Sequence, residues 1–330
     1  MLVSYRDQSV RLTGRWDVTD PKYAEATAPG SYIEFAFEGR MAMALFDITA
    51  NAVPYLHLWI EVDGGARVET PIDSHMRIHA KDGGKHICRI IYKGGMELYD
   101  RWFRPLSSKV SFIGYIADAP AELPEDNRRI IEFVGDSITE GVLIDVDYYR
   151  EQGTPAKPVD HLCRPNQDDV CATYAWLTAE ALDLRPVFMG YGAVGVTKSG
   201  CGKVPPAPDA YPYNFDGSPV TRETPDYVLI NHGANDRPKP AEVYTQNYGE
   251  LLDKVREMNP KAQIISLSAF CGGHHEALGA FIAEYNERTG ADVLFIDTAG
   301  WISPEPLHPL RDGHRTVSEN LVEILKNKLK

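Results

Sequence analysis

The sequence predicts an α/β protein in which a doubly wound parallel sheet follows a β-sandwich domain. The first third of the 330 residues contains short alternating apolar and polar runs with Gly-rich turns between them, which is typical of antiparallel strands. From residue 130 onward, short continuous apolar runs alternate with segments of helical spacing, as in parallel strands buried on both faces. We therefore predict a β-sandwich over 1–118, a linker over 119–129 and an α/β domain over 130–330.

The strands of the first domain are predicted from their alternation. In "SYIEFAFEG", Ile33, Phe35 and Phe37 fall on one face, and Glu34 and Glu38 fall on the other. Further strands follow at short spacing in "MALFDI", "YLHLWIEVDGG", "HICRIIYKGG" and "KVSFIGYI". The polar, proline-containing stretch "DAPAELPEDNRR" then predicts the linker.

The second domain is predicted from apolar runs that alternate with amphipathic stretches. The expected parallel strands are "IIEFVG", "PVFMGYG", "DYVLINHG", "AQIISLSA" and "DVLFIDT". The expected helices are "DVCATYAWLTAEALDL", "AEVYTQNYGELLDKVREM", "HEALGAFIAEYNERTG" and "RTVSENLVEILKNKLK". Because functional sites of doubly wound sheets lie at the carboxyl ends of the strands, the residues that follow these runs are the candidates for chemistry.

Charge and composition narrow the class of partner. The formal net charge of −13 disfavours binding to nucleic acid or to anionic membranes. The five cysteines are odd in number and form no C-x-x-C pair, so we expect buried free thiols and neither a disulfide framework nor a zinc site. No run has the length of a membrane span, and the N-terminus lacks the apolar core of a signal peptide, so a cytoplasmic protein is expected. A chain whose signal had been removed would look similar.

Several groups that could take part in acyl transfer follow these strands. The first strand is followed by Asp136 and Ser137, the second by "GYGAVG", the third by "NHGAND", and the last by a loop that contains His308. Acyl transfer needs a nucleophile, a base that takes its proton, and hydrogen-bond donors for the tetrahedral oxyanion. A hydroxyl, an imidazole, an amide and a glycine loop at one sheet edge would supply these parts.

These blocks resemble the SGNH (GDSL-like) hydrolases over roughly residues 130–330. The matching residues are Gly135-Asp136-Ser137-Ile138, Gly192, Gly233-Ala234-Asn235-Asp236 and Leu307-His308-Pro309. The resemblance implies a flavodoxin-like sheet, Ser137 as the nucleophile, His308 as the general base, and no cofactor or metal. It also implies an oxyanion hole formed by the backbone N–H groups of Ser137 and Gly192 and the side chain of Asn235. Asp136 and Asp236 would hold loops in place without reacting.

The sequence departs from the family pattern at one position. The family usually has Asp three residues before its histidine, where this chain has Glu305. We predict that Glu305 orients the His308 ring as the acid of a triad does. The alternative is a dyad, known in other members of the family, in which a backbone carbonyl orients the histidine.

The whole chain is similar to the family-2 carbohydrate esterases, which place a small β-sandwich before an SGNH domain. The sandwich resembles theirs at Gly14-Arg15, "IEFAFEG" and Val62-Asp63-Gly64. This resemblance implies a jelly-roll-like sandwich and removal of O-acetyl groups from oligosaccharides such as xylan or mannan fragments. Two alternatives remain, namely a lysophospholipase or thioesterase, and a carbohydrate-binding protein with an inert hydrolase domain. A homo-oligomer is possible.

Other motifs favour structural roles. "GYGAVG" fits a dinucleotide fingerprint, but a Gly- and Pro-rich loop follows it where that fingerprint needs a helix. His274 and His275 are adjacent and have no evident third ligand, so no metal site is expected. His314 could rival His308 as the base, but its place near the last helix favours packing or capping.

Substrate contacts are predicted from residues near strand ends and in long polar loops. Tyr191, Arg237 and Trp301 lie close to strand ends and are candidates to bind the sugar. The loops 144–169 and 197–225 carry aromatic side chains among polar residues, which suits stacking on sugar rings. Equally, these aromatic side chains could anchor their own loops.

Overall fold

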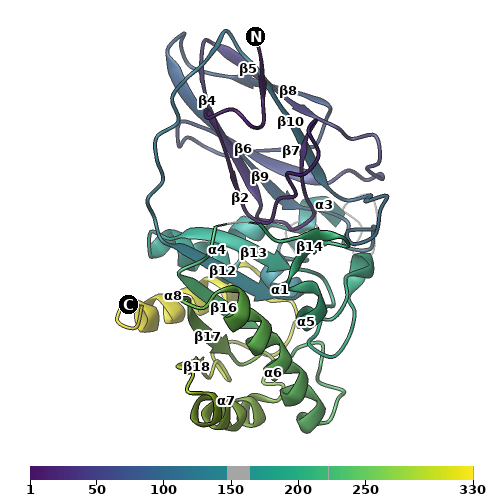
Figure 1. The fold of residues 1–330 in the computed structure, drawn as a ribbon, viewed down its shortest axis with the longest axis vertical. Coiled ribbons are helices and arrows are strands. Elements are labelled where there is room, and N and C mark those ends of the chain that lie inside the picture. The colour runs from purple at the N-terminus through teal and green to yellow at the C-terminus, as the bar shows by residue number, and fades with distance from the viewer. Residues whose placement is uncertain (147–163, 222, 330) are drawn as a thin grey trace.

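The computed structural model describes residues 1–146, 164–221 and 223–329, and these form two domains stacked end to end (Figure 1). The N-terminal domain consists of β-strands, and the C-terminal domain is a parallel sheet covered by helices. Within the part of the chain that is described, no helix has both the length and the apolar character needed to cross a membrane.

The N-terminal domain is built from two antiparallel sheets that face each other. The first has the strand order β1-β10-β5-β8, with β3 also paired to β10. Its strands are β1 (Leu2–Ser4), β3 (Ala24–Ala26), β5 (Met41–Phe46), β8 (His75–His79) and β10 (Val110–Ile116). The second has the order β11-β4-β9-β6-β7, with β2 also paired to β4. Its strands are β2 (Val10–Thr13), β4 (Tyr32–Glu38), β6 (His57–Val62), β7 (Val68–Pro71), β9 (Lys85–Gly94) and β11 (Ala119–Pro120).

The alternation in β4 places its apolar face in the core as predicted. Ile33, Phe35 and Phe37 are buried in the cluster between the two sheets. Glu34 lies on the opposite face, where Arg11 and Arg89 of the neighbouring strands form ion pairs with its carboxylate. These cross-strand pairs satisfy a charge that would otherwise be costly to bury.

The sandwich extends further along the chain than predicted. Ala119 and Pro120 form β11 and pair with Glu38 and Phe37 of β4, so the start of the expected linker belongs to a sheet. Pro120 is tolerated there because β11 is an edge strand, where the missing N–H removes no ladder bond.

The C-terminal domain contains a five-stranded parallel sheet of order β13-β12-β16-β17-β18. Taken along the chain, this is the order 2-1-3-4-5 of flavodoxin-like sheets. The strands are β12 (Ile130–Gly135), β13 (Arg185–Gly190), β16 (Tyr227–Asn231), β17 (Gln263–Leu267) and β18 (Leu294–Ile296). Side chains of β12 point alternately into two separate cores, Phe133 into one and Val134 into the other, which explains the continuous apolar runs.

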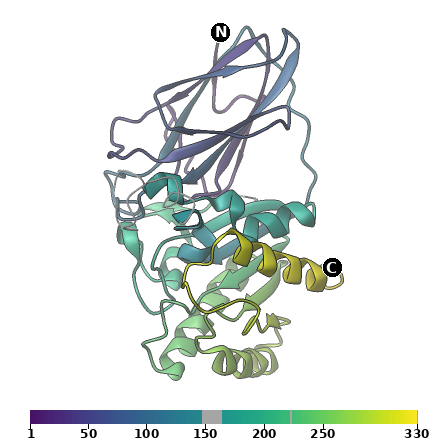
Figure 2. The same cartoon turned by 180° about the vertical axis from the view of Figure 1, so that it is seen from behind.

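Helices cover both faces of this sheet. On one face, α6 (Ala241–Met258) and α7 (His275–Thr289) contribute Leu251 and Ile282 to the core. On the other face, α4 (Tyr174–Ala181) and α8 (Arg311–Leu325) contribute Tyr174 and Leu321 (Figure 2). The shorter elements are α1 (Ser137–Glu140), α3 (Arg164–Gln167), η1 (Val170–Ala172), η2 (Cys201–Lys203), α5 (Ala207–Ala210), β14 (Tyr213–Phe215) and β15 (Ser218–Pro219).

The two domains share a polar interface that is largely buried. In its interior, Arg15 Nε of the sandwich donates to Glu132 Oε1 of β12 at 3.0 Å, and Lys93 Nζ donates to the carbonyl of Asp168 at 2.7 Å. The connection between β9 and β10, residues 95–109, also reaches the α/β domain, and we call it the sandwich arm. Its Arg101 and Glu97 form ion pairs with Glu140 and Arg164 of that domain.

Candidate active site

The turn at 135–137, which carries the predicted nucleophile Ser137 and which we call the nucleophile turn, follows directly from β12. Gly135 ends the strand, and a Cβ at this position would lie 2.1 Å from Thr139 Oγ1, so only glycine allows the chain to turn here. Asp136 caps α1, because its Oδ1 accepts a hydrogen bond from Ile138 N at 2.9 Å. Ser137 is therefore the first helical residue, and its own N–H has no acceptor within the helix.

The structure brings Ser137 and His308 together as predicted. His308 lies in the loop between β18 and α8, and its Nε2 is 2.8 Å from Ser137 Oγ. Burial lowers the pKa of His308, nearby Glu97 opposes this shift, and nearby Arg164 adds to it. A neutral imidazole within hydrogen-bond distance of a hydroxyl can take its proton.

Glu305 is not placed as the sequence predicts. Its side chain is exposed, and its backbone N–H and carbonyl both bond to the Ser303 hydroxyl, at 3.2 and 2.7 Å. This local turn directs the carboxylate into solvent, and no carboxylate among the described residues is hydrogen-bonded to His308. No backbone carbonyl among the described residues is hydrogen-bonded to His308 either, so the geometry does not place Glu305 as the acid of a triad, and the dyad stays a prediction.

Two of the three predicted oxyanion donors, the Asn235 amide and the Gly192 N–H, already have acceptors in this structure. Asn235 lies beside the catalytic turn, and its Nδ2 donates to Asp136 Oδ2 and to the carbonyl of Val194, both at 3.1 Å. The N–H of Gly192 differs from the prediction, because it donates to Glu140 Oε2 at 2.5 Å. An oxyanion could use that N–H only if Glu140 released it.

The two supporting aspartates hold loops together in the way the family resemblance implies. Asp236 is buried and accepts hydrogen bonds from Val196 N at 3.2 Å and from Thr197 N at 2.9 Å, which fixes the loop after β13. Asp136 links the nucleophile turn to Asn235, and burial raises its pKa to about 7. His314 is likewise structural, because its Nδ1 accepts the N–H of Tyr174 at 3.0 Å in the core.

The three predicted substrate contacts have different environments. The prediction for Tyr191 is corrected, because its ring is 2 % exposed and its hydroxyl bonds to Thr27 Oγ1 of the sandwich at 2.9 Å. Arg237 is exposed next to Asn235, and Trp301 is half-buried, so their roles stay predictions. Of the first long loop, residues 147–163 lie outside the described part of the chain.

The sequence did not predict a group of buried charged side chains at the domain interface, next to the nucleophile turn. Arg101 and Glu140 form an ion pair with side chains 1 % and 0 % exposed, and Glu140 in turn accepts the Gly192 N–H. Glu97 pairs with Arg164 at 2.9 Å. Glu140 could have been noticed because it lies three residues after Ser137, but no pattern in the sequence links it to the sandwich arm.

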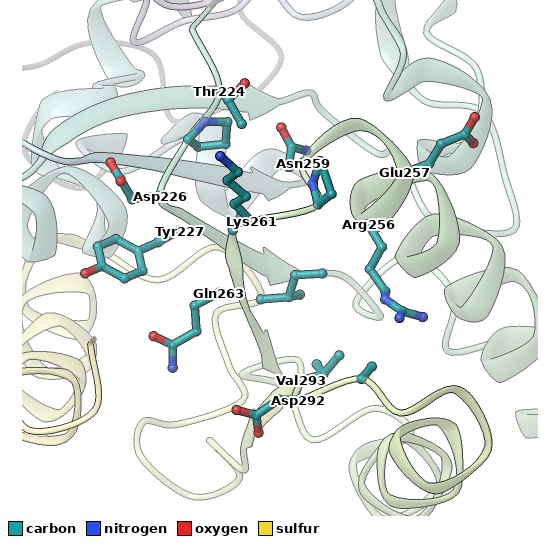
Figure 3. A pocket seen from close by; sticks show the side chains of 15 residues that line it. Thr224, Asp226, Tyr227, Arg256, Glu257, Asn259, Lys261, Gln263, Asp292 and Val293 are labelled. Atoms are coloured by element: carbon teal, nitrogen blue, oxygen red, sulfur yellow. The ribbon is translucent and has the colours of Figure 1, made fainter.

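A pocket of about 740 Å³ lies at the other edge of the sheet (Figure 3). It is lined by residues that precede β16, β17 and β18, including Asp226, Lys261 and Asp292. Since Ser137 and His308 follow strand ends and do not line it, this pocket is separate from the candidate active site. Within the described residues, no group of three or more His, Cys, Asp or Glu side chains is arranged to hold a metal ion.

A serine and a histidine within hydrogen-bond distance at the carboxyl edge of a flavodoxin-like sheet are the arrangement expected of a serine hydrolase. The model of the GDSL-like lipase/acylhydrolase family matches residues 133–316, and the chain belongs to this family. The matched region includes the nucleophile turn, the loops after β13 and β16, and the loop that carries His308.

Two curated relatives that match nearly the whole chain have esterase or deacetylase in their names. The chain is 26 % identical to the cellulase/esterase CelE of Acetivibrio thermocellus over 97 % of its length, but it spans only 39 % of that protein. It is 22 % identical to an acetylxylan esterase / glucomannan deacetylase of Cellvibrio japonicus, with 98 % of this chain and 90 % of the relative covered.

The fold is shared with solved structures of the same kind. A family-two carbohydrate esterase from Cellvibrio japonicus matches with a TM-score of 0.80 at 19 % identity, over 99 % of this chain and 97 % of that one. One from Clostridium thermocellum matches with a TM-score of 0.78 at 20 % identity, over 98 % and 99 % of the two chains. Both matches include the β-sandwich as well as the hydrolase domain.

Proposed function

We propose that the protein is a serine esterase that removes O-acetyl groups from acetylated oligosaccharides such as xylan or mannan fragments. The observation that carries this proposal is the 2.8 Å contact between His308 Nε2 and Ser137 Oγ at the functional edge of the sheet. The carbohydrate-esterase relatives, which match across both domains, support the choice of substrate class.

The proposed reaction uses these residues in two half-reactions. His308 takes the Ser137 proton while Oγ attacks the acetyl carbonyl, and the Ser137 N–H stabilises the oxyanion. The Asn235 amide adds a second donor once one of its hydrogens leaves Asp136 or Val194. The C–O bond to the sugar then breaks, and His308 gives its proton to the leaving sugar oxygen. In the second half, His308 takes a proton from water, the hydroxide attacks the acetyl-serine, and acetate leaves as Ser137 regains its proton.

The substrate class is tested by two measurements on the wild-type protein. Acetate release is measured from a panel of acetylated xylo- and manno-oligosaccharides, and kcat/KM is measured for p-nitrophenyl esters from acetyl to octanoyl. We expect release from the sugars and a steep fall in kcat/KM with chain length. A preference for octanoyl esters would instead support a lysophospholipase or thioesterase.

The pH dependence follows from the state of His308. The ring must be neutral to accept the Ser137 proton, so kcat/KM should rise with pH through the pKa of His308 and be lost below it. Because burial lowers this pKa from 6.5, the acidic limb of the profile should lie below pH 6.5. Measuring kcat/KM for p-nitrophenyl acetate between pH 4 and 9 checks this.

Asp136 is a second group whose titration could shape the pH profile, and a variant distinguishes it from His308. Burial raises the pKa of Asp136 to about 7, so this carboxyl could produce a limb close to neutrality. An acidic limb near pH 7 that disappears in Asp136→Asn would belong to Asp136, and the prediction for His308 would then be wrong.

Glu305→Gln is expected to lower kcat by only a few-fold. The reason is that the Glu305 carboxylate is exposed and has no hydrogen bond to His308, whereas removal of a true orienting acid costs up to ~10⁴ in kcat. The measurement is kcat with p-nitrophenyl acetate at the pH optimum. A loss of ~10³-fold or more would restore Glu305 as the acid of a triad.

A further inference from the structure

Glu97 is a carboxylate of the β-sandwich domain that packs against Gly192 and Arg164 of the hydrolase domain. It belongs to the sandwich arm, and its side chain is 16 % exposed. Its Oε1 accepts a hydrogen bond from Arg164 Nη2 at 2.9 Å. A Cβ at Gly192 would lie only 1.9 Å from Glu97 Oε2, so this second oxygen rests directly on the glycine backbone.

This position is next to the catalytic pair. Gly192 bonds to Glu140, which lies three residues after the nucleophile in the same short helix. In the parallel ladder, Gly135 of β12 pairs with Gly190 of β13, so Gly192 follows its strand end at the same level as Ser137 follows its own. Glu97 therefore packs on the strand-end segment that runs beside the turn of Ser137.

The chemistry of this position favours a hydroxyl-bearing group over an acyl chain. An ionised carboxylate only accepts hydrogen bonds, and the hydroxyl groups of a sugar are donors. An apolar chain placed against Glu97 would remove water from the charge and offer no hydrogen bond in return, which is costly. Arg164 holds one carboxylate oxygen in place, so the other is presented in a fixed direction.

We propose that Glu97 accepts a hydrogen bond from a hydroxyl group of the sugar, next to the acetylated oxygen. The β-sandwich domain would then take part in selecting the alcohol that leaves. This inference rests on the proposed function, because it assumes that the leaving alcohol is a sugar.

The test compares two substrates that carry the same acyl group. Glu97→Gln keeps the shape of the side chain and removes its charge. A hydrogen bond to a charged group typically contributes about 10- to 100-fold in binding, so kcat/KM for an acetylated xylo-oligosaccharide should fall by about that factor more than kcat/KM for p-nitrophenyl acetate. Glu97→Asp keeps the charge but shortens the side chain by one methylene, so the same ratio should change by an intermediate amount.

Asp100→Asn is the matched control. Asp100 lies on the same arm and forms an ion pair with Lys203 at 3.0 Å, and it makes no contact with the catalytic residues. The ratio of the two kcat/KM values should stay at the wild-type value in this variant.

The outcomes separate this inference from the proposed function. An equal fall for both substrates in Glu97→Gln, or no fall for either, overturns the role of Glu97. If Glu97→Gln does not fold, a wild-type ratio in Glu97→Asp overturns it. If the wild-type protein cleaves p-nitrophenyl acetate but no acetylated sugar, the proposed function itself is wrong.

Discussion

Ser137→Ala is expected to reduce acetate release from acetylated oligosaccharides by ~10⁴- to 10⁶-fold, because removing the nucleophile removes the covalent route. The hydroxyl that is lost is the one 2.8 Å from His308 Nε2, so the general base would have no proton to take. What remains is the contribution of binding and of the oxyanion donors. The measurement is kcat/KM for acetate release with wild type and variant side by side.

Ser266→Ala is a suitable control for this experiment. Ser266 is also buried in the C-terminal domain, where its hydroxyl is 2.7 Å from that of Tyr248, but it belongs to the core and not to the active site. This variant should keep wild-type kcat and lose only stability. Activity of Ser137→Ala within tenfold of wild type would show that the nucleophile is another residue. A wild-type protein that binds these sugars without cleaving them would support the inert carbohydrate-binding alternative.

That Ser137 and His308 lie at one edge of the sheet could be predicted from periodicity, and the family resemblance predicted their roles as a pair. Each parallel strand reads as an apolar run, and the sheet brings the residues after these runs to one edge whatever their distance in the chain. The same local signals predicted α6, whose observed bounds Ala241–Met258 coincide with the amphipathic stretch. Hydrophobic spacing is a property of a single segment, so it can be read without knowing what packs against it.

The environment of Tyr191, Gly192 and Glu305 could not be predicted, because it is set by other segments. Tyr191 follows a strand end, yet Thr27 of the sandwich covers its hydroxyl and the ring is buried. Gly192 fits a family block, but its N–H donates to Glu140 of helix α1. Glu305 has the spacing of a triad acid, and a bond to Ser303 turns it outward. No pattern within one segment reports such contacts.

Arg101→Met is expected to affect both stability and catalysis, because Arg101 is the buried partner of the residue that holds Gly192. Removing one member of a fully buried ion pair leaves an uncompensated charge, which lowers the free energy of unfolding by about 3–5 kcal/mol. Burial raises the pKa of Glu140 and Arg101 opposes this, so in the variant Glu140 would tend to take up a proton. A protonated Glu140 is a weaker acceptor for the Gly192 N–H, and the loop beside Ser137 should become less ordered.

Arg15→Met separates these two effects, because Arg15 and Glu132 form the other ion pair in the domain interface with side chains 1 % and 0 % exposed. Among the described residues, Arg15 and Glu132 form side-chain bonds to one another, to Tyr211 and to Tyr213. This variant should therefore lose comparable stability in urea unfolding and keep its kcat when folded. Arg101→Met should lose kcat as well, with KM for p-nitrophenyl acetate changing less. If Arg101→Met lost only stability, the sandwich arm would stabilise the domain interface and have no effect on catalysis. A loss of kcat confined to Arg101→Met would mean that Ser137 works beside a loop, the one at Gly192, whose order depends on the β-sandwich.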